Sequence, residues 1–402
     1  MAASDRQEAP MHQAPAILDH MPAILGHLKD HQVVVVSAEP GSGKSSVLPR
    51  CLASAGYGPV ICAQPRHLAA TVASAKAAGE ATETGAVFTT TRVLADVLRD
   101  PPAVAAAFRA VVVDEAHDRT LCADAVLAMV RAALASGAMG GCRVVVCAAG
   151  GPAGGVLGDF FSGAPVLAFR RPASPVHVHY SAGPVIDMVG AVVDEEAAIH
   201  RSRPPGDVLA FLPEVVDVEE ACHRLRRLGL PGLLACVVHD HLPAELIGVA
   251  LDPAPAGARK VVLATDVAET AVPVPGITYV VDSGVLSEAE PVEMISKEAA
   301  ERRRRAAANG AGTGHCHRLY TQAEHAGLDE HAVPFIRRDG AHLMFALILR
   351  RHGADGMPGF EFLEPSVKLA LESVVTELVA AGFLDQHGKL TEKGEREAYD
   401  ED

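Results

Sequence analysis

Short runs of apolar, mostly β-branched residues recur along the chain, separated by longer stretches with helical spacing. Each half of the sequence holds four of these runs: Gln32–Ala38, Gly58–Gln64, Arg109–Asp114, Arg143–Ala148, Asp207–Leu212, Gly232–Val238, Lys260–Thr265 and Ile277–Asp282. A strand that is apolar on both faces is covered on both faces, and strands that alternate with helices assemble into parallel sheets. The pattern therefore predicts an α/β protein with two domains, each built on a parallel sheet.

Changes in composition mark the expected domain boundaries. The stretch Arg170–Pro175 indicates a linker, and the strand pattern stops after Tyr320. The segment Glu364–Ala381 then carries an apolar helical face, and two short apolar pairs flank Asp385–Gly388 as in a wing hairpin. The residues of that helical face are Val367, Leu371, Val374 and Leu378. We expect a disordered segment 1–14, two α/β domains at 15–170 and 171–323, and a small winged-helix-like α+β domain at 324–402.

Composition narrows the compartment and the partners. Eight cysteines without any CxxC pair, several of them inside apolar runs, indicate buried free thiols rather than disulfides or zinc sites. Charges interrupt every apolar run before it could cross a bilayer, and the N-terminus lacks the apolar core of a signal peptide. We therefore expect a soluble intracellular protein of the nucleus or cytoplasm, without a membrane partner. The formal net charge of −15 argues against nucleic-acid binding by bulk attraction but leaves room for basic strips in a cleft.

A phosphate-binding loop follows the first predicted strand. In the segment Ala38-Glu-Pro-Gly-Ser-Gly-Lys44-Ser45, small residues let backbone N–H groups converge on phosphates, Lys44 reaches the β and γ oxygens, and Ser45 ligates Mg²⁺. We expect the loop to open a helix directly. The alternative, a glycine-rich turn with a chance lysine, does not account for the buried strand before it. The residues expected at the nucleotide are Gly41, Ser42, Gly43, Lys44, Ser45 and Ser46.

The third run ends in two carboxylates, Asp114 and Glu115. A buried strand that ends in this way places both groups beside the phosphate-binding loop, at the carboxyl edge of the sheet. Asp114 is then expected to hold the Mg²⁺ shell together with Ser45. Glu115 is expected to orient or deprotonate the attacking water, so that Lys44, Asp114 and Glu115 form the catalytic set. The alternative, an acidic helix N-cap, does not explain a carboxylate pair so close to a phosphate-binding loop.

Other segments agree with one known family. Asp114-Glu-Ala-His117-Asp-Arg-Thr resembles the signature of the DEAH-box (DEAH/RHA) RNA helicases. Six further segments resemble other motifs of this family and occur in the same order along the chain: Gln64-Pro-Arg66-His, Phe88-Thr-Thr90-Thr91, Pro205–Leu212, Leu263–Thr270, Asp282-Ser-Gly284 and Cys316-His-Arg318-Leu-Tyr320. The resemblance covers the chain from about Gln32 to Tyr320, and the predicted winged helix extends it towards the C-terminus.

The resemblance implies two RecA-like P-loop NTPase domains followed by a winged helix, with ATP and Mg²⁺ as cofactors and RNA as partner. It also implies that Arg66, Thr90 and Thr265 contact the RNA backbone, which positions a strand without reading its sequence. For the two threonines, a helix cap or a strand-end hydroxyl is the alternative. An activating protein partner, spliceosomal or ribosomal, is left open.

The chain departs from the family pattern where the family keeps its arginine fingers. Counting back from Tyr320 gives Arg303, Arg304, Ala307 and Gly310 where the family has a glutamine followed by three arginines at intervals of three. Arginine fingers are worth about 10³–10⁵ in rate, so their loss predicts slow hydrolysis with nucleotide binding retained. One alternative is a shifted register in which the Arg302–Arg305 run supplies the finger, and another is that this run is a solvated helix face.

Other departures from the family pattern indicate weak coupling between ATP hydrolysis and RNA binding. Ala148-Ala149-Gly150 stands where the family has Ser-Ala-Thr, and Val285–Glu293 is too short for a long strand-parting hairpin. We also expect the family's helical and OB-fold modules, which follow its winged helix, to be missing. Two functions remain: an RNA-dependent NTPase without processive unwinding, and an impaired helicase remnant acting as an RNA- or protein-binding scaffold. His239-Asp-His241 and His315-Cys-His317 resemble metal-ligand pairs, but zinc needs three or four convergent ligands.

Overall fold

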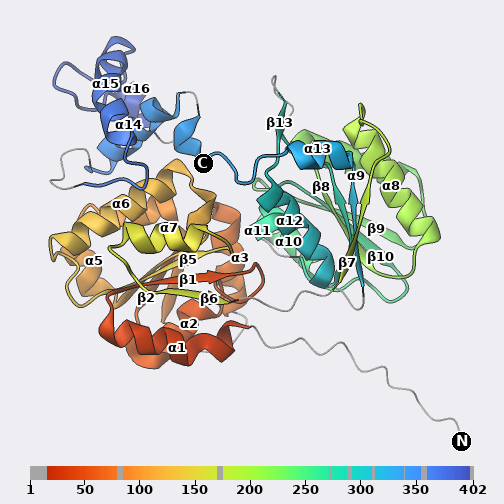
Figure 1. Ribbon diagram of the computed structural model, residues 1–402, viewed down its shortest axis with the longest axis horizontal. Helices are drawn as coiled ribbons and strands as arrows, with labels where there is room; N and C mark the ends of the chain where they lie inside the picture. Colours follow the sequence, from red (N-terminus) through yellow and green to blue (C-terminus); the bar gives the residue numbers. More distant parts are fainter. Residues whose placement is uncertain are drawn as a thin grey trace, which may run out of the picture.

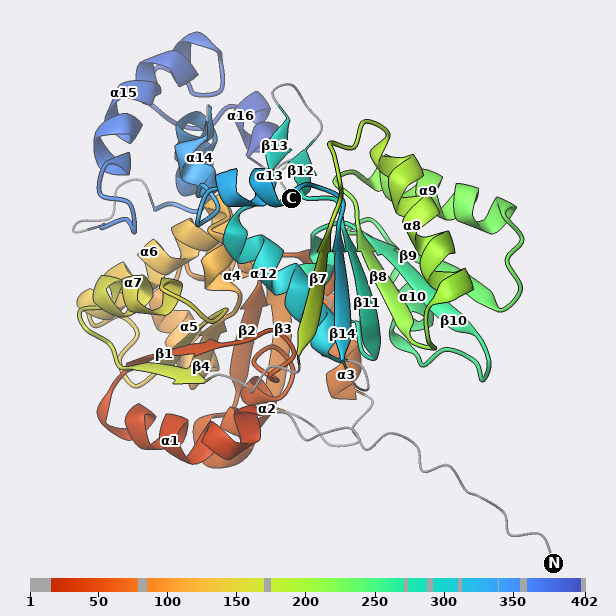
Figure 2. The ribbon, with the colours of Figure 1, turned by 45° about the vertical axis from the view of Figure 1, so that its right-hand side comes forward.

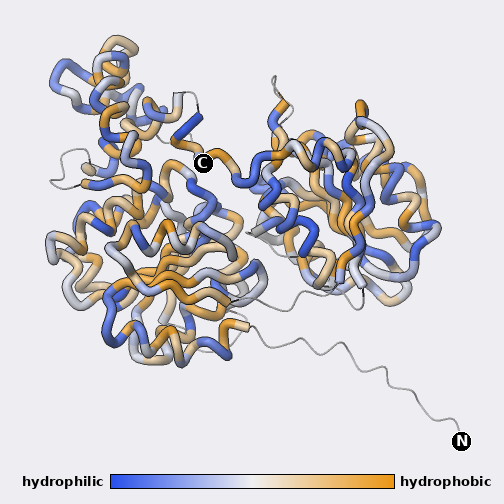
Figure 3. Tube along the Cα trace, viewed as in Figure 1, coloured by the Kyte–Doolittle hydropathy of each residue, from blue (hydrophilic) through white to orange (hydrophobic). Residues whose placement is uncertain are grey.

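The computed structural model describes residues 16–78, 85–169, 175–270, 274–287, 292–309, 313–338, 340–354 and 360–398. Its strands form two six-stranded sheets and one antiparallel pair, and every pairing within the two large sheets is parallel (Figure 1). Apolar strands lie inside both halves (Figure 3). The predicted α/β fold on two parallel sheets is confirmed. The disorder expected at 1–14 and the linker residues 170–174 lie outside the described residues.

The first sheet has the strand order β3-β2-β4-β5-β1-β6 and is covered on both faces. Because side chains alternate along a strand, Val34 and Val36 of β1 face α1 and α2, whereas Val35 faces α4, α6 and α7. The strands are β1 (Val33–Ala38), β2 (Val60–Gln64), β3 (Ala86–Thr90), β4 (Ala110–Val113), β5 (Arg143–Ala148) and β6 (Val166–Phe169). The helices are α1 (Ile17–Asp30), α2 (Leu48–Leu52), α3 (His67–Ala78), α4 (Thr91–Val97), α5 (Pro101–Ala107), α6 (Leu121–Ala135) and α7 (Ala153–Phe160).

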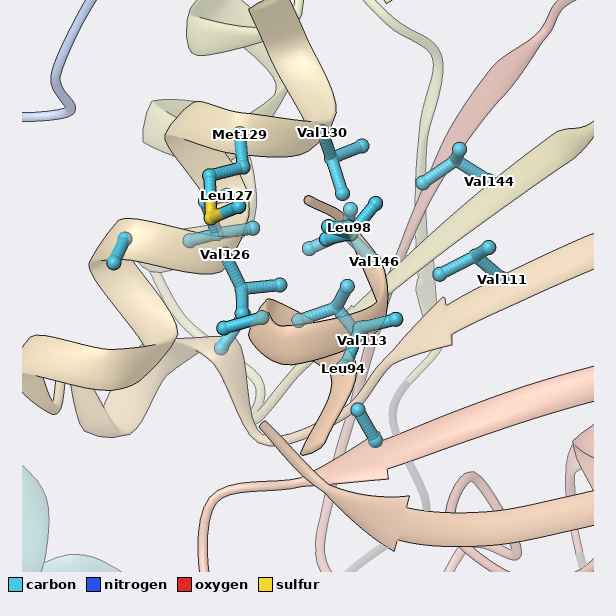
Figure 4. Packing of buried hydrophobic residues seen from close by; sticks show 14 of the residues in the cluster. Leu94, Leu98, Val111, Val113, Val126, Leu127, Met129, Val130, Val144 and Val146 are labelled. Carbon is cyan, nitrogen blue, oxygen red and sulfur yellow. The ribbon is translucent and has the colours of Figure 1, made fainter. Parts of the chain in front are cut away.

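The core above this sheet fixes the carboxyl end of β4, where the acidic pair begins. Figure 4 shows side chains of α4 and α6 meeting those of β4 and β5. The labelled residues are all buried: Leu94, Leu98, Val111, Val113, Val126, Leu127, Met129, Val130, Val144 and Val146. Complete burial of one such side chain is worth about 1.5–3 kcal/mol, so this cluster anchors the strand firmly.

The second sheet has the order β7-β14-β11-β8-β10-β9. Helices α8 and α9 cover one face, and α10 and α11 cover the other, which also receives Leu68 and Val72 of α3 from the first half. The two halves therefore share an apolar contact. The strands are β7 (Val176–Tyr180), β8 (Asp207–Phe211), β9 (Leu233–Val238), β10 (Arg259–Ala264), β11 (Ile277–Asp282) and β14 (Gly314–Arg318). The helices are α8 (Met188–Ser202), α9 (Val215–Arg227), α10 (Ala244–Leu251), α11 (Val267–Thr270), α12 (Lys297–Ala306) and α13 (Gln322–Gly327).

The C-terminal helices follow the second sheet in the chain but pack on the first half. They are α14 (Ala341–Arg351), α15 (Val367–Ala380) and α16 (Glu392–Glu397). Phe345 and Ile348 of α14 join the cluster that contains Val130 of α6, and Figures 1 and 2 both show α14 beside α6. The predicted helix at 364–381 is found as α15, with its apolar face inward. The predicted hairpin is reduced to one bridge between Leu384 and Leu390, and the winged-helix assignment stays a prediction.

The structure corrects several expected elements. Strands β3, β6, β7 and β14 were not expected as parts of the sheets; β3, β6 and β7 are edge strands, which are less apolar than central ones. The helix after the phosphate-binding loop begins at Leu48, since Pro49 has no N–H to donate to the Ser45 carbonyl. Val285 to Met294 includes a two-stranded antiparallel pair, β12 (Val285–Ser287) with β13 (Glu293–Met294).

Two further expectations concern single residues and helices. Six of the eight cysteines are buried, as the apolar runs around them predicted, and no disulfide joins any of the eight. Among the described residues, no helix is both long enough and apolar enough to span a membrane.

Candidate nucleotide site and nucleic-acid interface

The loop after β1 places a buried lysine among backbone groups. Gly41 and Gly43 have φ values of 75° and 100°, a region that glycine adopts without steric cost. The Lys44 ammonium donates to the carbonyls of Ala38 and Glu39 at 2.5 and 3.1 Å. The Ser42 hydroxyl is buried, and no group of the described residues hydrogen-bonds it. Among the described residues, the hydrogen bonds of the Lys44 ammonium go to carbonyls of its own loop, and the Ser42 hydroxyl has no partner. Converging donors of this kind suit an anion.

The acidic pair lies on the same edge of the sheet. Strand β5 separates β4 from β1, and because all three are parallel, both loops open at their carboxyl ends. Asp114 is completely buried, and its carboxylate accepts from the Gln64 side-chain amide and the Glu115 N–H, each at 2.9 Å. Glu115 has φ 46° and ψ 35°, a left-handed conformation that costs a non-glycine residue roughly 1–2 kcal/mol. Strain of this kind is concentrated at functional sites.

Burial shifts the pKa values of Glu115 and of the neighbouring His117. Burial raises the pKa of the Glu115 carboxyl well above its usual range, and the nearby Lys44 ammonium opposes that shift. Burial, with Arg302 and Lys44 nearby, lowers the pKa of His117 to about 3. The neutral imidazole accepts at Nδ1 from the Ala149 N–H at 3.2 Å. The segment after β5, which itself carries no hydroxyl, therefore contacts the acidic signature through a backbone amide.

The four arginines of α12, in the second half, have different surroundings. Arg303 is buried between Glu269 (2.6 Å) and Asp282 (2.9 Å), and so has a structural role. Arg304 pairs with Glu301 of its own helix at 2.6 Å. The other two arginines, Arg302 and Arg305, lie towards the first half.

Those two arginines face the candidate nucleotide site. Arg302 pairs with Glu269 at 3.2 Å and lowers the pKa of His117, as noted above. Arg305 reaches across to Glu39 in the phosphate-binding loop. Of the arginines of this helix, Arg305 is the one bound to that loop.

Ala307, one of the two positions expected to have lost an arginine finger, does not face this cleft. Ala307 is 1% exposed and belongs to the apolar cluster of the second sheet, with Val280 and Cys316. An arginine at this position would be buried in the core of the second half instead of reaching the phosphate-binding loop. For Ala307, the structure thus disagrees with the assignment made by counting from Tyr320. Gly310 lies outside the described residues.

The three residues expected on RNA lie at carboxyl ends of strands. Thr90 caps α4, its hydroxyl accepting from the Val93 N–H at 3.3 Å, which matches the alternative of a helix cap. Thr265 is buried directly after β10. Arg66, after β2, forms ion pairs with Asp240 (2.6 Å) and Asp266 (2.7 Å) of the second half. The structure thus brings Arg66 close to the Thr265 segment, while Thr90 remains on the neighbouring strand β3.

A cavity of about 1420 Å³ lies between the two halves and the C-terminal segment. Six arginines, including Arg66, and nine carboxylates line this cavity. The arginines are Arg66, Arg92, Arg119, Arg302, Arg337 and Arg338, and the acids are Asp118, Asp240, Asp266, Glu269, Glu293, Glu298, Asp329, Glu330 and Glu364. Within this wall, carboxylates accompany most of the arginines, so the cavity does not present a simple cationic surface.

Two comparisons with known proteins bear on this arrangement. No protein-family model matches the chain. The chain superposes on the crystal structure of Escherichia coli DEAH/RHA helicase HrpB with a TM-score of 0.81, at 24% sequence identity and over 95% of its own length. The chain shares the fold of the superposed part of that helicase. The superposition covers 52% of HrpB, so the chain spans about half the length of that helicase.

Sequence reasoning missed the ion pairs that cross between the halves. Glu39 bonds Arg305, and Asp240 and Asp266 bond Arg66, yet none of these three acids was expected at a site. The signal was present for two of them, because Asp240 and Asp266 are each the second residue after a strand, β9 and β10, much as Asp114 is the first residue after β4. No group of three or more potential metal ligands occurs among the described histidines, cysteines and carboxylates.

Proposed function

We propose that the chain is an ATP-dependent, RNA-helicase-like NTPase, which binds Mg·ATP at the phosphate-binding loop and RNA backbone across its two halves. The observation that carries the proposal is the meeting of three groups at one cleft: the Lys44 loop, the Asp114–Glu115 pair and Arg305. The first two belong to one sheet edge, and the third comes from the second half in a DEAH/RHA helicase fold. Phosphoryl transfer in such enzymes depends on positioning and on cations near the developing charge.

The residues present suit a nucleotide and its metal ion. The unpartnered Ser42 hydroxyl and the Lys44 ammonium offer donors to phosphate, with Gly41, Gly43, Ser45 and Ser46 lining the same loop. Mg²⁺ takes one or two carboxylates together with phosphate oxygens and waters, so Ser45 and Asp114 are a sufficient protein contribution. Bound there, Mg²⁺ would neutralise charge on the phosphates.

Each catalytic side chain must change one contact when ATP binds. Lys44 exchanges the carbonyls of Ala38 and Glu39 for phosphate oxygens. Glu115 must be ionised to accept a proton from water, and the positive charge of Lys44 already favours that form. Arg305 must leave Glu39 to reach the transferring phosphoryl group. The shifted-register alternative is thus preferred here over the loss of the finger.

For RNA, we propose contacts from Arg66, Thr90 and Thr265 to the phosphodiester backbone. The assignment of 15–170 and 171–323 as RecA-like domains and of 324–402 as a winged-helix-like domain belongs to the same proposal. An activating protein partner remains part of it, with its binding surface unassigned.

ATP hydrolysis with and without single-stranded RNA tests the proposal. We expect RNA-stimulated turnover in the wild type, its loss in Lys44→Ala, and a fall of about 10³ in Arg305→Ala, the magnitude of an arginine finger. Arg304→Ala is the matched control, since Arg304 pairs within its own helix. A Lys44→Ala protein that kept the thermal stabilisation by Mg·ATP would contradict the loop assignment.

The second candidate function is a nucleotide-binding scaffold without turnover. It is favoured by the segment Ala148–Gly150, which has no hydroxyl and reaches His117 through the Ala149 N–H. Thermal stabilisation by Mg·ATP combined with no hydrolysis in the wild type, with or without RNA, would select this function.

A further inference from the structure

Arg66 is bound by carboxylates of the second half on both of its terminal nitrogens. Nη1 donates to Asp240 at 2.6 Å and to Asp266 at 3.3 Å, and Nη2 donates to Asp266 at 2.7 Å. A guanidinium matches carboxylate and phosphate oxygens by the same two-pronged geometry. The groups that now accept from Arg66 therefore occupy the positions that a phosphate would take.

The surroundings make this contact strong but incomplete. Burial opposes the charge of Arg66, yet Asp266 and Asp240 together raise its pKa above the usual value. Asp118 of the first half is also close enough to contribute. One oxygen of Asp240 is buried without a hydrogen-bond partner among the described residues, which is a cost of the present arrangement.

The contact also spans the two halves of the molecule. Arg66 precedes α3, whose Leu68 and Val72 pack into the second half, so the arginine lies at the edge of an apolar interface. Its partners follow β9 and β10 of the second sheet. The pairing consequently depends on how the second half is placed against the first.

We propose that Asp240 and Asp266 form a removable cap on Arg66, so that an RNA backbone binds there only by displacing both carboxylates. The inference rests on the proposed RNA binding and adds its regulation. The cap lowers the affinity of the resting protein for RNA. It also links that affinity to the relative position of the two halves, because Arg66 belongs to the first half and both carboxylates belong to the second.

A double-mutant cycle separates cap release from simple removal of negative charge. We would measure the dissociation constant of a fluorescein-labelled oligouridylate by anisotropy at fixed salt. The proteins are the wild type, Asp240→Asn/Asp266→Asn, Arg66→Ala and the triple variant. Asn keeps the shape of Asp, and Asp266→Asn alone serves if the double variant folds poorly. Glu293→Gln/Glu330→Gln is the charge-matched control, since these acids line the same cavity but pair with Arg338 and Lys297.

If the cap exists, Asp240→Asn/Asp266→Asn should bind the RNA about five- to tenfold more tightly, because a partly exposed ion-pair network no longer has to be broken. The control variant should gain little affinity. In the Arg66→Ala background the same two substitutions should give no gain. An equal gain in both backgrounds, or none in either, overturns the cap while leaving RNA binding intact. If no protein of the set binds the RNA, the proposed function fails, and the cap fails with it.

Discussion

The side-chain carboxyl group of Glu196, in α8, is isolated in the protein core. It is completely buried in the core of the second half, and no group of the described residues hydrogen-bonds either oxygen. Burial therefore raises its pKa well above the usual range, because it disfavours the ionised form. Arg66 and Arg305 show the opposite situation, since each places its charge against carboxylates of the other half.

Replacing Glu196 by leucine should stabilise the protein, and more so at higher pH. A carboxyl with a raised folded-state pKa contributes stability below its unfolded pKa of about 4.3, and this is lost as pH rises towards the folded value. The wild type should lose about 1.4 kcal/mol per pH unit in that window relative to Glu196→Leu. Urea unfolding of both proteins from acid to mildly alkaline pH measures this difference. The exposed neighbour Asp194, changed to Asn, is the control, and an unchanged gap between wild type and Glu196→Leu would contradict the burial argument.

At the scale of elements, strands β7 and β14 align four histidines at the edge of the second sheet. In the parallel register His177 lies opposite His315, and His179 lies opposite His317. His179 Nε2 and His315 Nδ1 are 3.2 Å apart. His317 Nδ1 lies 2.6 Å from Glu195 of α8. Burial and the neighbouring imidazoles lower the pKa of His179 and of His315.

This histidine group should make the edge of the sheet sensitive to acid. A histidine with a depressed folded-state pKa favours its neutral form, so stability is present above the unfolded pKa of about 6.5 and is lost as pH falls below it. We expect His179→Gln and His315→Gln each to reduce the fall in urea midpoint between neutral and mildly acidic pH. The exposed His223, changed to Gln, should not. Equal acid sensitivity in all four proteins would rule out a role for the group.

The same elements show how far the sequence could predict the fold. The eight apolar runs each match an observed strand, because a strand buried on both faces carries a nearly continuous apolar pattern. Of the edge strands, β3 and β7 escaped prediction, since β3 carries threonines and β7 alternates valine with histidine. The loop of Lys44 and the pair Asp114–Glu115 could be located because strand-end position alone brings them to one edge. Pairs such as Arg66–Asp266 could not, because they depend on how two separately formed sheets meet.

At the scale of the whole molecule, charge is balanced locally rather than gathered on one surface. The net charge is −15, and the carboxylates of the cavity pair with Arg66, Arg119, Arg302, Arg337 and Arg338. Helix α14 returns to pack on α6 (Figure 2). Residues from both halves and from the C-terminal segment line the cavity. A polyanion entering it meets few unpaired cations and must replace existing carboxylate contacts.

RNA binding should accordingly show a shallow salt dependence and little sequence preference. If Arg66 and one or two further cations neutralise about two or three phosphates, the slope of log K against log salt for single strands is about −1 to −2. Contacts to backbone position a strand without distinguishing bases, so oligouridylate and a mixed sequence of equal length should bind alike. Anisotropy titrations at several salt concentrations measure both quantities. A slope steeper than about −5 would reveal a cationic track that the paired arginines do not provide. A strong preference between the two RNAs would instead mean that side chains read base edges, contrary to a backbone-binding helicase-like protein.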